Sequence, residues 1–314
     1  MATKHQITQE ILDARNTAQD VVRRKYLREL SEYTGRDTIL YCTAYSTPKA
    51  EGVPQNALSL VTEDIQGFMT AIHDLKGDKL DIIIHSPGGH VEAVEQIINY
   101  LRAKYSHIRA IIPQSAMSAA TMLACACDEI LMGKHSAIGP IDPQLSFPSP
   151  NGFFTAPAHS ILNEFNQAKK EIAADPKTAP LWIPKLSTWP AGFLDICEKT
   201  IKLAKDRVAQ WLESYMFYGE AEAKTKAKDI AEWLGTFDNH LTHGRPISIE
   251  TALSHGLKIA KLESDQELQE RVLSVFHSAI VTIEITNTVK IIENNKGVGV
   301  FTQVQRNNLI VPRP

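Results

Sequence analysis

The residues whose types and spacing could do chemistry are one serine and a pair of glycines about thirty positions before it. Gly88 and Gly89 follow an apolar run, 81–85, that is typical of a buried strand. A glycine has no Cβ, so it leaves backbone N–H groups open to a cavity, and this bend could form an oxyanion hole. Ser118 stands where a second apolar run, 108–113, gives way to a helix of small residues, and the positive end of the helix dipole would favour its reactivity. This pattern suits acyl transfer through a serine nucleophile.

Apolar runs typical of strands alternate with helical periodicities along the first half of the chain. A long amphipathic helix at 7–34 is followed by a strand at 38–44, a helix at 58–75, a strand ending at 85, a helix at 91–105, a strand from 108, a helix from 118 to 128 and a strand at 129–132. Such alternation is the signature of a mostly parallel sheet covered by helices. We therefore expect an α/β core.

The second half of the chain reads mainly as helices. A turn-rich segment at 139–154 leads to a helix at 158–174, a proline-rich bridge, and helices at 191–216 and 221–234 that suit a lid or an oligomer surface. Residues 244–262 predict a turn, a helix and a strand, and 279–304, rich in Val, Ile and Thr, favours β-structure.

These elements predict three parts. They are an N-terminal helical extension at 1–36, a main domain at 37–301 with a helical insertion at about 175–240, and a C-terminal tail at 302–314.

Composition excludes several classes of function. The 314 residues carry a formal charge of −3, which gives no general attraction to nucleic acid or to an anionic membrane surface. No stretch approaches the ~20 apolar residues of a membrane span and the first residues lack an apolar leader core, so we expect a cytoplasmic protein. The four cysteines include Cys125 and Cys127, which point to different sides of an expected helix. We expect neither zinc, nor a disulfide framework, nor a cofactor.

Four sequence blocks, in this order, resemble the Clp protease and signal peptide peptidase A superfamily. They are Ile-His-Ser-Pro-Gly-Gly at 84–89, Ser-Ala-Met-Ser-Ala-Ala at 115–120, Asp-Glu-Ile at 128–130 with Ser-Ala-Ile-Gly-Pro at 136–140, and the segment 244–258 from Gly-Arg-Pro-Ile-Ser to His-Gly-Leu-Lys. Within that superfamily, the blocks at 139–144, 275–278 and 290–294 resemble the serine dehydrogenase proteinase family. The resemblance extends from about residue 38 to 301.

The resemblance implies a ClpP/crotonase-like fold with Ser118 as the nucleophile. It also implies an oxyanion hole made by backbone amides at Gly88, Gly89, His90 and Ala119. Members of the superfamily assemble around their sites, so a homo-oligomer is implied, together with a polypeptide substrate and an unfoldase or adaptor partner.

A serine hydroxyl needs a proton acceptor within about 2.6–3.2 Å. The Clp branch uses a histidine about twenty-five positions past the serine, but 140–143 reads Pro-Ile-Asp-Pro. Signal peptide peptidases use a lysine, and Lys169 is our first choice, because it lies near the apolar face of its expected helix, where burial would lower its pKa. His159, at the start of that helix, titrates in the useful range. Lys199 is a weaker third alternative.

Other histidines have simpler interpretations. His85, His90, His135 and His277 are expected to be structural, although His90 could still contribute its backbone N–H. His240 and His243 form a His-x-x-His pair that lacks a helix and a third ligand, so we expect no metal there.

The leading hypothesis is a cytoplasmic serine peptidase that works through an acyl-enzyme. The open question of the proton acceptor keeps a second hypothesis, a catalytically inactive oligomeric scaffold of the same fold. A crotonase-type enzyme acting on acyl-CoA is a further alternative, because the same amides can stabilise an enolate oxygen.

Overall fold

The computed structural model describes residue 4, residues 6–7, 18–149 and 152–304. These residues form two compact units. The first contains the described residues up to Ile138 and from Ile247 onward, and the second is Gly139–Pro246.

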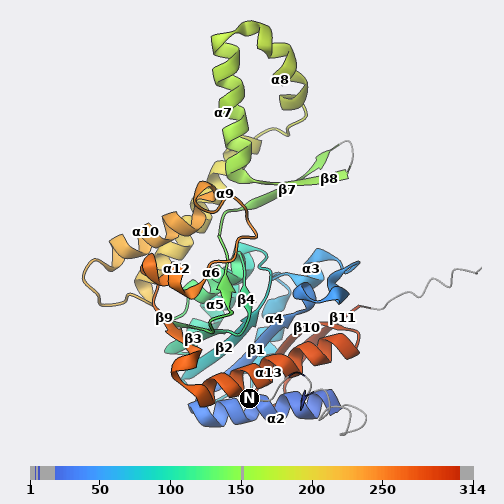
Figure 1. Cartoon of the computed structure of the whole chain (residues 1–314), viewed down its shortest axis with the longest axis vertical. Coiled ribbons are helices and arrows are strands. Elements are labelled where there is room, and N and C mark those ends of the chain that lie inside the picture. The colour runs from blue at the N-terminus through green and yellow to red at the C-terminus, as the bar shows by residue number, and fades with distance from the viewer. Residues whose placement is uncertain (1–3, 5, 8–17, 150–151, 305–314) are drawn as a thin grey trace, which may run out of the picture. The chain divides into compact units, whose positions relative to one another are not determined.

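A seven-stranded sheet forms the centre of the first unit (Figure 1). Its strand order is β11-β10-β1-β2-β3-β5-β9, with the bounds β1 Asp37–Thr43, β2 Lys79–His85, β3 His107–Ile112, β5 Glu129–Met132, β9 Ile259–Lys261, β10 Thr288–Asn294 and β11 Gly299–Gln303. Neighbours from β1 to β9 pair in parallel, whereas β10 and β11 pair antiparallel. Two short strands, β4 (Ser115–Ala116) and β6 (Ala137–Ile138), pair beside this sheet. The predicted mostly parallel sheet is confirmed.

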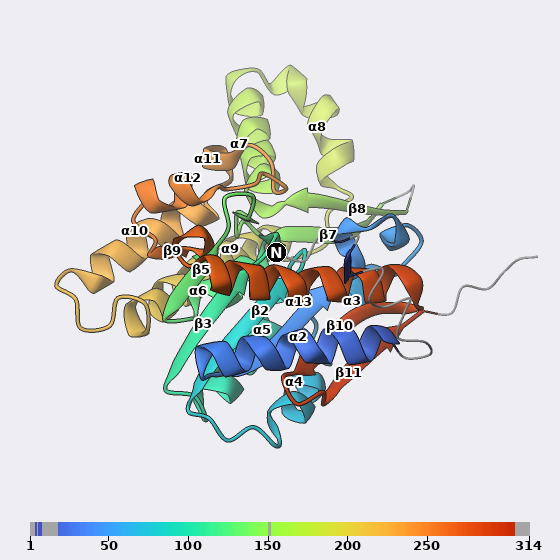
Figure 2. The same cartoon turned by 60° about the horizontal axis from the view of Figure 1, so that its bottom comes forward.

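Helices cover both faces of this sheet. In Figure 2, α2 (Ala18–Thr34) and α13 (Gln266–Ile285) lie side by side in front of it, and both contribute to an apolar cluster that includes Leu40 of β1. The next residue, Tyr41, points to the opposite face and stacks on Phe68 of α4 (Asp64–Ile72), with ring centroids 5.9 Å apart. On that face α4 contacts α5 (Val91–Arg102), which contacts α6 (Ala119–Cys125). Two shorter helices are α3 (Gln55–Leu58) and α12 (Ile249–Ser254). The α/β, ClpP/crotonase-like class predicted from sequence is confirmed.

The structure bears out the sequence predictions near the two ends of the chain only in part. The predicted N-terminal helix is present as α2, while its positions 8–17 lie outside the described residues. The prediction of β-structure at 279–304 is wrong for 279–285, which complete α13. Ile280, Val281 and Ile283 are buried there, and tertiary packing outweighs the strand preference of β-branched residues.

The second unit is a hairpin followed by helices. The antiparallel strands β7 (Gln144–Ser149) and β8 (Gly152–Pro157) lead into α7 (Ala158–Ala174), α8 (Ala179–Leu186), α9 (Phe193–Ser214), α10 (Ala223–Gly235) and α11 (Phe237–His240). The predicted helix at 158–174 is confirmed to the residue. The hairpin and α8 were not predicted, since prolines and turn residues dominate both segments. An apolar cluster that includes Ile161, Phe193 and Cys197 joins α7 to α9.

Candidate active site

Ser118 occupies a strained position between β4 and α6. Its backbone has φ 51° and ψ −121°, outside the regions that L-residues favour, and such strain costs about 1–3 kcal/mol. The side chain does not cap α6. Its Oγ has no hydrogen-bond partner within the described residues, and the residue is half-buried. The turn therefore presents an unoccupied hydroxyl instead of using it for local stability.

The glycine bend lies directly against this serine. Gly88 has φ +99°, and a Cβ added to it would stand 2.7 Å from Ser118 Cβ and 2.8 Å from Ala119 N. Both the backbone conformation and the close approach therefore require glycine at position 88. The predicted proximity of the bend to Ser118 is confirmed.

A second segment fixes the bend from its other side. Leu60 N–H donates to Gly88 O at 2.7 Å, and His90 N–H donates to Leu60 O at 2.9 Å. These two bonds form an isolated parallel bridge between Leu60 and Gly89. A Cβ on Gly89 would lie 2.1 Å from Leu60 O, so the second glycine is required by close packing.

The four amides predicted for an oxyanion hole differ in whether their N–H groups are already hydrogen-bonded. The N–H groups of Gly89 and Ala119 have no partner among residues 18–149 and 152–304. Gly88 N–H donates to Ser86 Oγ at 3.2 Å. The use of His90 as a donor is contradicted, because its N–H already donates to Leu60 O. Gly89 and Ala119 flank the contact between Gly88 and Ser118, and they are the pair suited to bind an oxyanion.

A group of neutral polar side chains contacts Ser115, a neighbour of Ser118 in the chain. Tyr45 hydroxyl hydrogen-bonds Ser115 Oγ, and its ring packs against His85 with centroids 4.8 Å apart. Burial lowers the pKa of His85 to about 3. His85 Nε2 lies 2.7 Å from Ser46 Oγ, so this imidazole is a buried, uncharged packing group.

The lysine candidates lie on the surface of the second unit. Lys169 is exposed on α7, with its Nζ 5.7 Å from the Phe165 ring centroid. Its predicted burial is wrong in this chain, because Ala158, Ile161 and Ala168 are the buried residues of α7. Lys199 is also exposed and pairs with Asp195 at 2.6 Å. The role of Lys169 as a proton acceptor stays a prediction.

His159 has the chemical state that a proton acceptor needs. It is the second residue of α7 and is half-buried. Burial lowers its pKa, and the charge of Lys205 lowers it further, so the imidazole is neutral at pH 7. Its Nδ1 is buried and has no hydrogen-bond partner in the described part of the chain.

One pair in the second unit was missed by the sequence analysis. Asp142 is fully buried and its Oδ1 lies 2.9 Å from His243 Nδ1, while Gln144 Nε2 donates to its Oδ2 at 2.8 Å. A carboxylate that orients an imidazole is the usual support of a general base. His240 is directed elsewhere, with Nε2 2.9 Å from Trp233 O, so the His-x-x-His pair does not act as one. The 101 positions between Asp142 and His243 left no local signal for this contact.

The predicted site residues therefore fall into two groups. Ser118, Gly88, Gly89, His90 and Ala119 belong to the first unit. The candidate acceptors His159 and Lys169, and the Asp142–His243 pair, belong to the second. Among the helices of the described residues, none combines the length and apolar character needed to cross a membrane.

Two curated proteins are similar to this chain over most of its length. The chain is 32% identical over 240 residues to the uncharacterized protein MJ0137 of Methanocaldococcus jannaschii, covering 76% of this chain and 73% of that protein. It is 28% identical over 238 residues to MJ1495 of the same organism, covering 76% and 71%.

Among solved structures, the 1510-N membrane-bound stomatin-specific protease is similar in two mutant forms. A mutant with a serine replaced by alanine matches with a TM-score of 0.39 and 18% identity, covering 68% of this chain and 79% of that one. A mutant with a lysine replaced by alanine, in complex with a substrate peptide, matches with the same TM-score and identity, covering 79% and 83%. The family pattern of the ClpP-like SDH-type serine proteinases matches residues 11–292, and the chain belongs to that family.

Proposed function

We propose that this chain is a cytoplasmic serine peptidase that cleaves polypeptides through an acyl-enzyme on Ser118. The observation that carries the proposal is the strained serine, whose hydroxyl is unbonded and whose Cβ lies close to Gly88, with the unbonded amides of Gly89 and Ala119 next to this contact in the chain. Strained residues of this kind cluster at active sites, and a strand-to-helix turn exposes a nucleophilic hydroxyl. The four cysteines are free thiols, which agrees with a reducing compartment.

In the proposed reaction, Ser118 Oγ attacks the carbonyl carbon of a peptide bond as its proton passes to the acceptor. The amides of Gly89 and Ala119 donate to the oxyanion of the tetrahedral intermediate. The acceptor then protonates the leaving amine, and a water molecule activated by the same group hydrolyses the ester.

His159 is our preferred acceptor, because its neutral imidazole has a buried and unbonded nitrogen. Lys169 remains the alternative proposed from sequence, and His243 oriented by Asp142 is a third. Separate substitutions of these three residues distinguish them.

A fluorophosphonate probe tests the proposal directly. Wild type should be labelled on Ser118, and Ser118→Ala should not. Ser115→Ala is the matched control, since Ser115 is a neighbouring serine whose Oγ is engaged by Tyr45. Failure of wild type to label would leave the inactive scaffold as the better hypothesis. Binding of a CoA ester in calorimetry, without labelling, would favour the crotonase alternative.

We also propose a homo-oligomer that receives its substrates with the help of an unfoldase or adaptor. Light scattering after size exclusion should then give a mass well above 34.9 kDa, and a monomer would remove the proposal.

A further inference from the structure

A buried ion pair stands behind the segment that fixes the glycine bend. Lys290 on β10 and Asp64 at the start of α4 are 2% and 6% exposed, and Lys290 Nζ lies 2.8 Å and 3.0 Å from the two Asp64 oxygens. Tyr41 hydroxyl donates to Asp64 Oδ2 at 2.8 Å. This pair is remote from Ser118 in sequence, and the mechanism above gives it no role.

The ion pair holds both neighbours of Leu60. Lys290 Nζ donates to Ser59 O at 2.7 Å, and Asp64 Oδ2 accepts from Val61 N–H at 3.1 Å. Leu60 itself has its N–H and its carbonyl occupied by Gly88 and His90. The three-residue segment 59–61 is therefore tied to the ion pair at its ends and to the glycine bend at its middle.

The geometry of the bridge determines where the Gly89 amide points. In a parallel bridge, the residue that lies between the two bonded positions directs its own N–H away from the partner segment. Leu60 bonds Gly88 O and His90 N–H, so Gly89 is that residue and its N–H faces away from Leu60. A shift of Leu60 would turn or displace this amide.

Stability alone does not explain the pair. Two charges removed from water gain little over well-packed apolar side chains, because desolvation offsets their attraction. What apolar groups cannot supply is directed hydrogen bonding to a carbonyl and an amide. Lys290 and Asp64 each direct one such hydrogen bond at segment 59–61.

We infer that Lys290 and Asp64 are positioning residues for the oxyanion site, acting through Ser59–Leu60–Val61 to hold the Gly89 amide in its binding orientation. The inference rests on the proposed peptidase function. Tyr41 donates to the Asp64 carboxylate and is a positioning residue of the same group.

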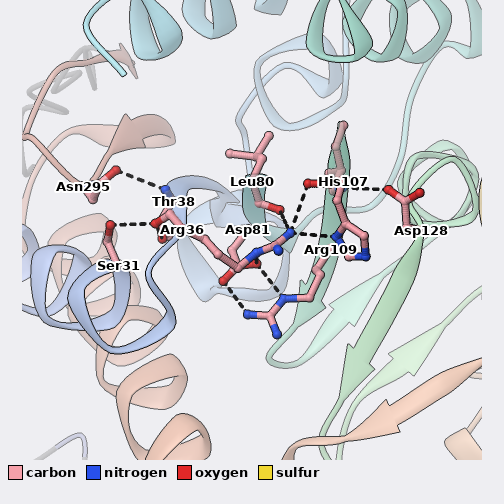
Figure 3. A network of polar contacts seen from close by, with 10 residues as sticks. Ser31, Arg36, Thr38, Leu80, Asp81, His107, Arg109, Asp128 and Asn295 are labelled. Carbon is pink, nitrogen blue, oxygen red and sulfur yellow. Dashed lines mark hydrogen bonds and ion pairs between the residues drawn. The ribbon is translucent and has the colours of Figure 1, made fainter. Parts of the chain in front are cut away.

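The first unit contains a second buried ionic network, centred on strands β2 and β3 (Figure 3). Asp81, near the start of β2, accepts from Arg109 at 2.7 Å and from Arg36 at 2.6 Å. Its carboxylate is fully buried, as the Asp64 carboxylate nearly is. In Figure 3 both guanidinium groups are directed at Asp81, with His107 beside Arg36. This network has no bond to segment 59–61 or to the glycine bend among the interactions of the described residues.

The test compares Lys290→Met with Arg109→Met in the full chain. Each removes one cation from a buried carboxylate that keeps another donor, Tyr41 in the first case and Arg36 in the second. The rate of Ser118 labelling by the fluorophosphonate, kcat and KM for a p-nitrophenyl ester, and the melting temperature are measured for both.

We expect both variants to melt earlier, but only Lys290→Met to lose labelling rate and kcat, by about tenfold to a hundredfold with KM little changed. Wild-type rates in a folded Lys290→Met would overturn the inference and leave the peptidase proposal intact. Should Lys290→Met fail to fold, Tyr41→Phe decides: a severalfold loss of kcat supports the inference, and no loss overturns it. If wild type itself is not acylated, the proposed function fails and the inference falls with it.

Discussion

Around Ser118 the chemical groups are backbone amides and one hydroxyl, held by hydrogen bonds between segments of the first unit. In the second unit, the candidate acceptors are side chains on α7 and on a loop, and Lys169 is fully on the surface. The first arrangement leaves little freedom, because Gly88 and Gly89 are both in contact with backbone atoms that cannot move cheaply. The second arrangement leaves several side chains as candidates for the proton acceptor. The difference teaches that geometry supports one proposal for the nucleophile and the oxyanion groups, whereas the choice of proton acceptor needs substitution and titration.

The largest effect should come from filling the contact at Gly88. In Gly88→Ala, the new methyl would meet Met117 O at 2.5 Å and Ser118 Cβ at 2.7 Å, so the serine turn must shift. We expect about a thousandfold loss of kcat for an ester substrate, of the order found when an oxyanion donor is removed.

Gly52→Ala is the control for the cost of placing alanine at a positive φ where the added Cβ meets no other atom. Gly52 has φ +79° but nothing within 4 Å of an added Cβ. This variant should lose stability and keep its kcat. If Gly88→Ala stays as active as Gly52→Ala, the rigid bend is not part of the site.

Substitution of His159 should have the next largest effect. A general base contributes typically 10²–10⁴-fold, so His159→Ala should lower kcat at least about a hundredfold. Lys169→Ala is compared with Lys170→Ala, because both lysines are exposed neighbours on α7. A loss of kcat in Lys169→Ala alone would identify Lys169 as the proton acceptor. A loss of kcat in His243→Ala alone would identify His243, oriented by Asp142, as the acceptor.

The pH profile of kcat/KM sharpens the same comparison. Burial lowers the pKa of His159, and a base must be unprotonated to act. Activity should therefore fall about tenfold per pH unit only below the pKa of His159, which lies under the ordinary histidine value of 6.5, and should be flat from there to about pH 8. A limb that rises above about pH 8 would instead indicate a lysine.

The contrast between the two regions also explains what could be predicted from sequence. An apolar run, two glycines and a serine before small residues are local signals, and the structure places the glycine bend beside the turn at Ser118. The loss of His90 N–H to Leu60 was not predictable, since that partner is about thirty residues away and belongs to no regular element. The Asp142–His243 contact spans 101 positions, and helix α13 continues through β-branched residues because tertiary packing buries them.

The smallest expected effect concerns stability. Ser118→Gly removes the nucleophile but relieves the cost of a side chain at φ 51°. Glycine adopts this conformation freely, while its greater freedom in the unfolded chain offsets part of the gain. We expect the free energy of unfolding to rise by about 1 kcal/mol relative to Ser118→Ala, which keeps the strain. Urea denaturation of the two inactive variants measures the difference directly. Equal stability would mean that the turn holds no strain at this serine, and the argument from its backbone to its function would lose its support.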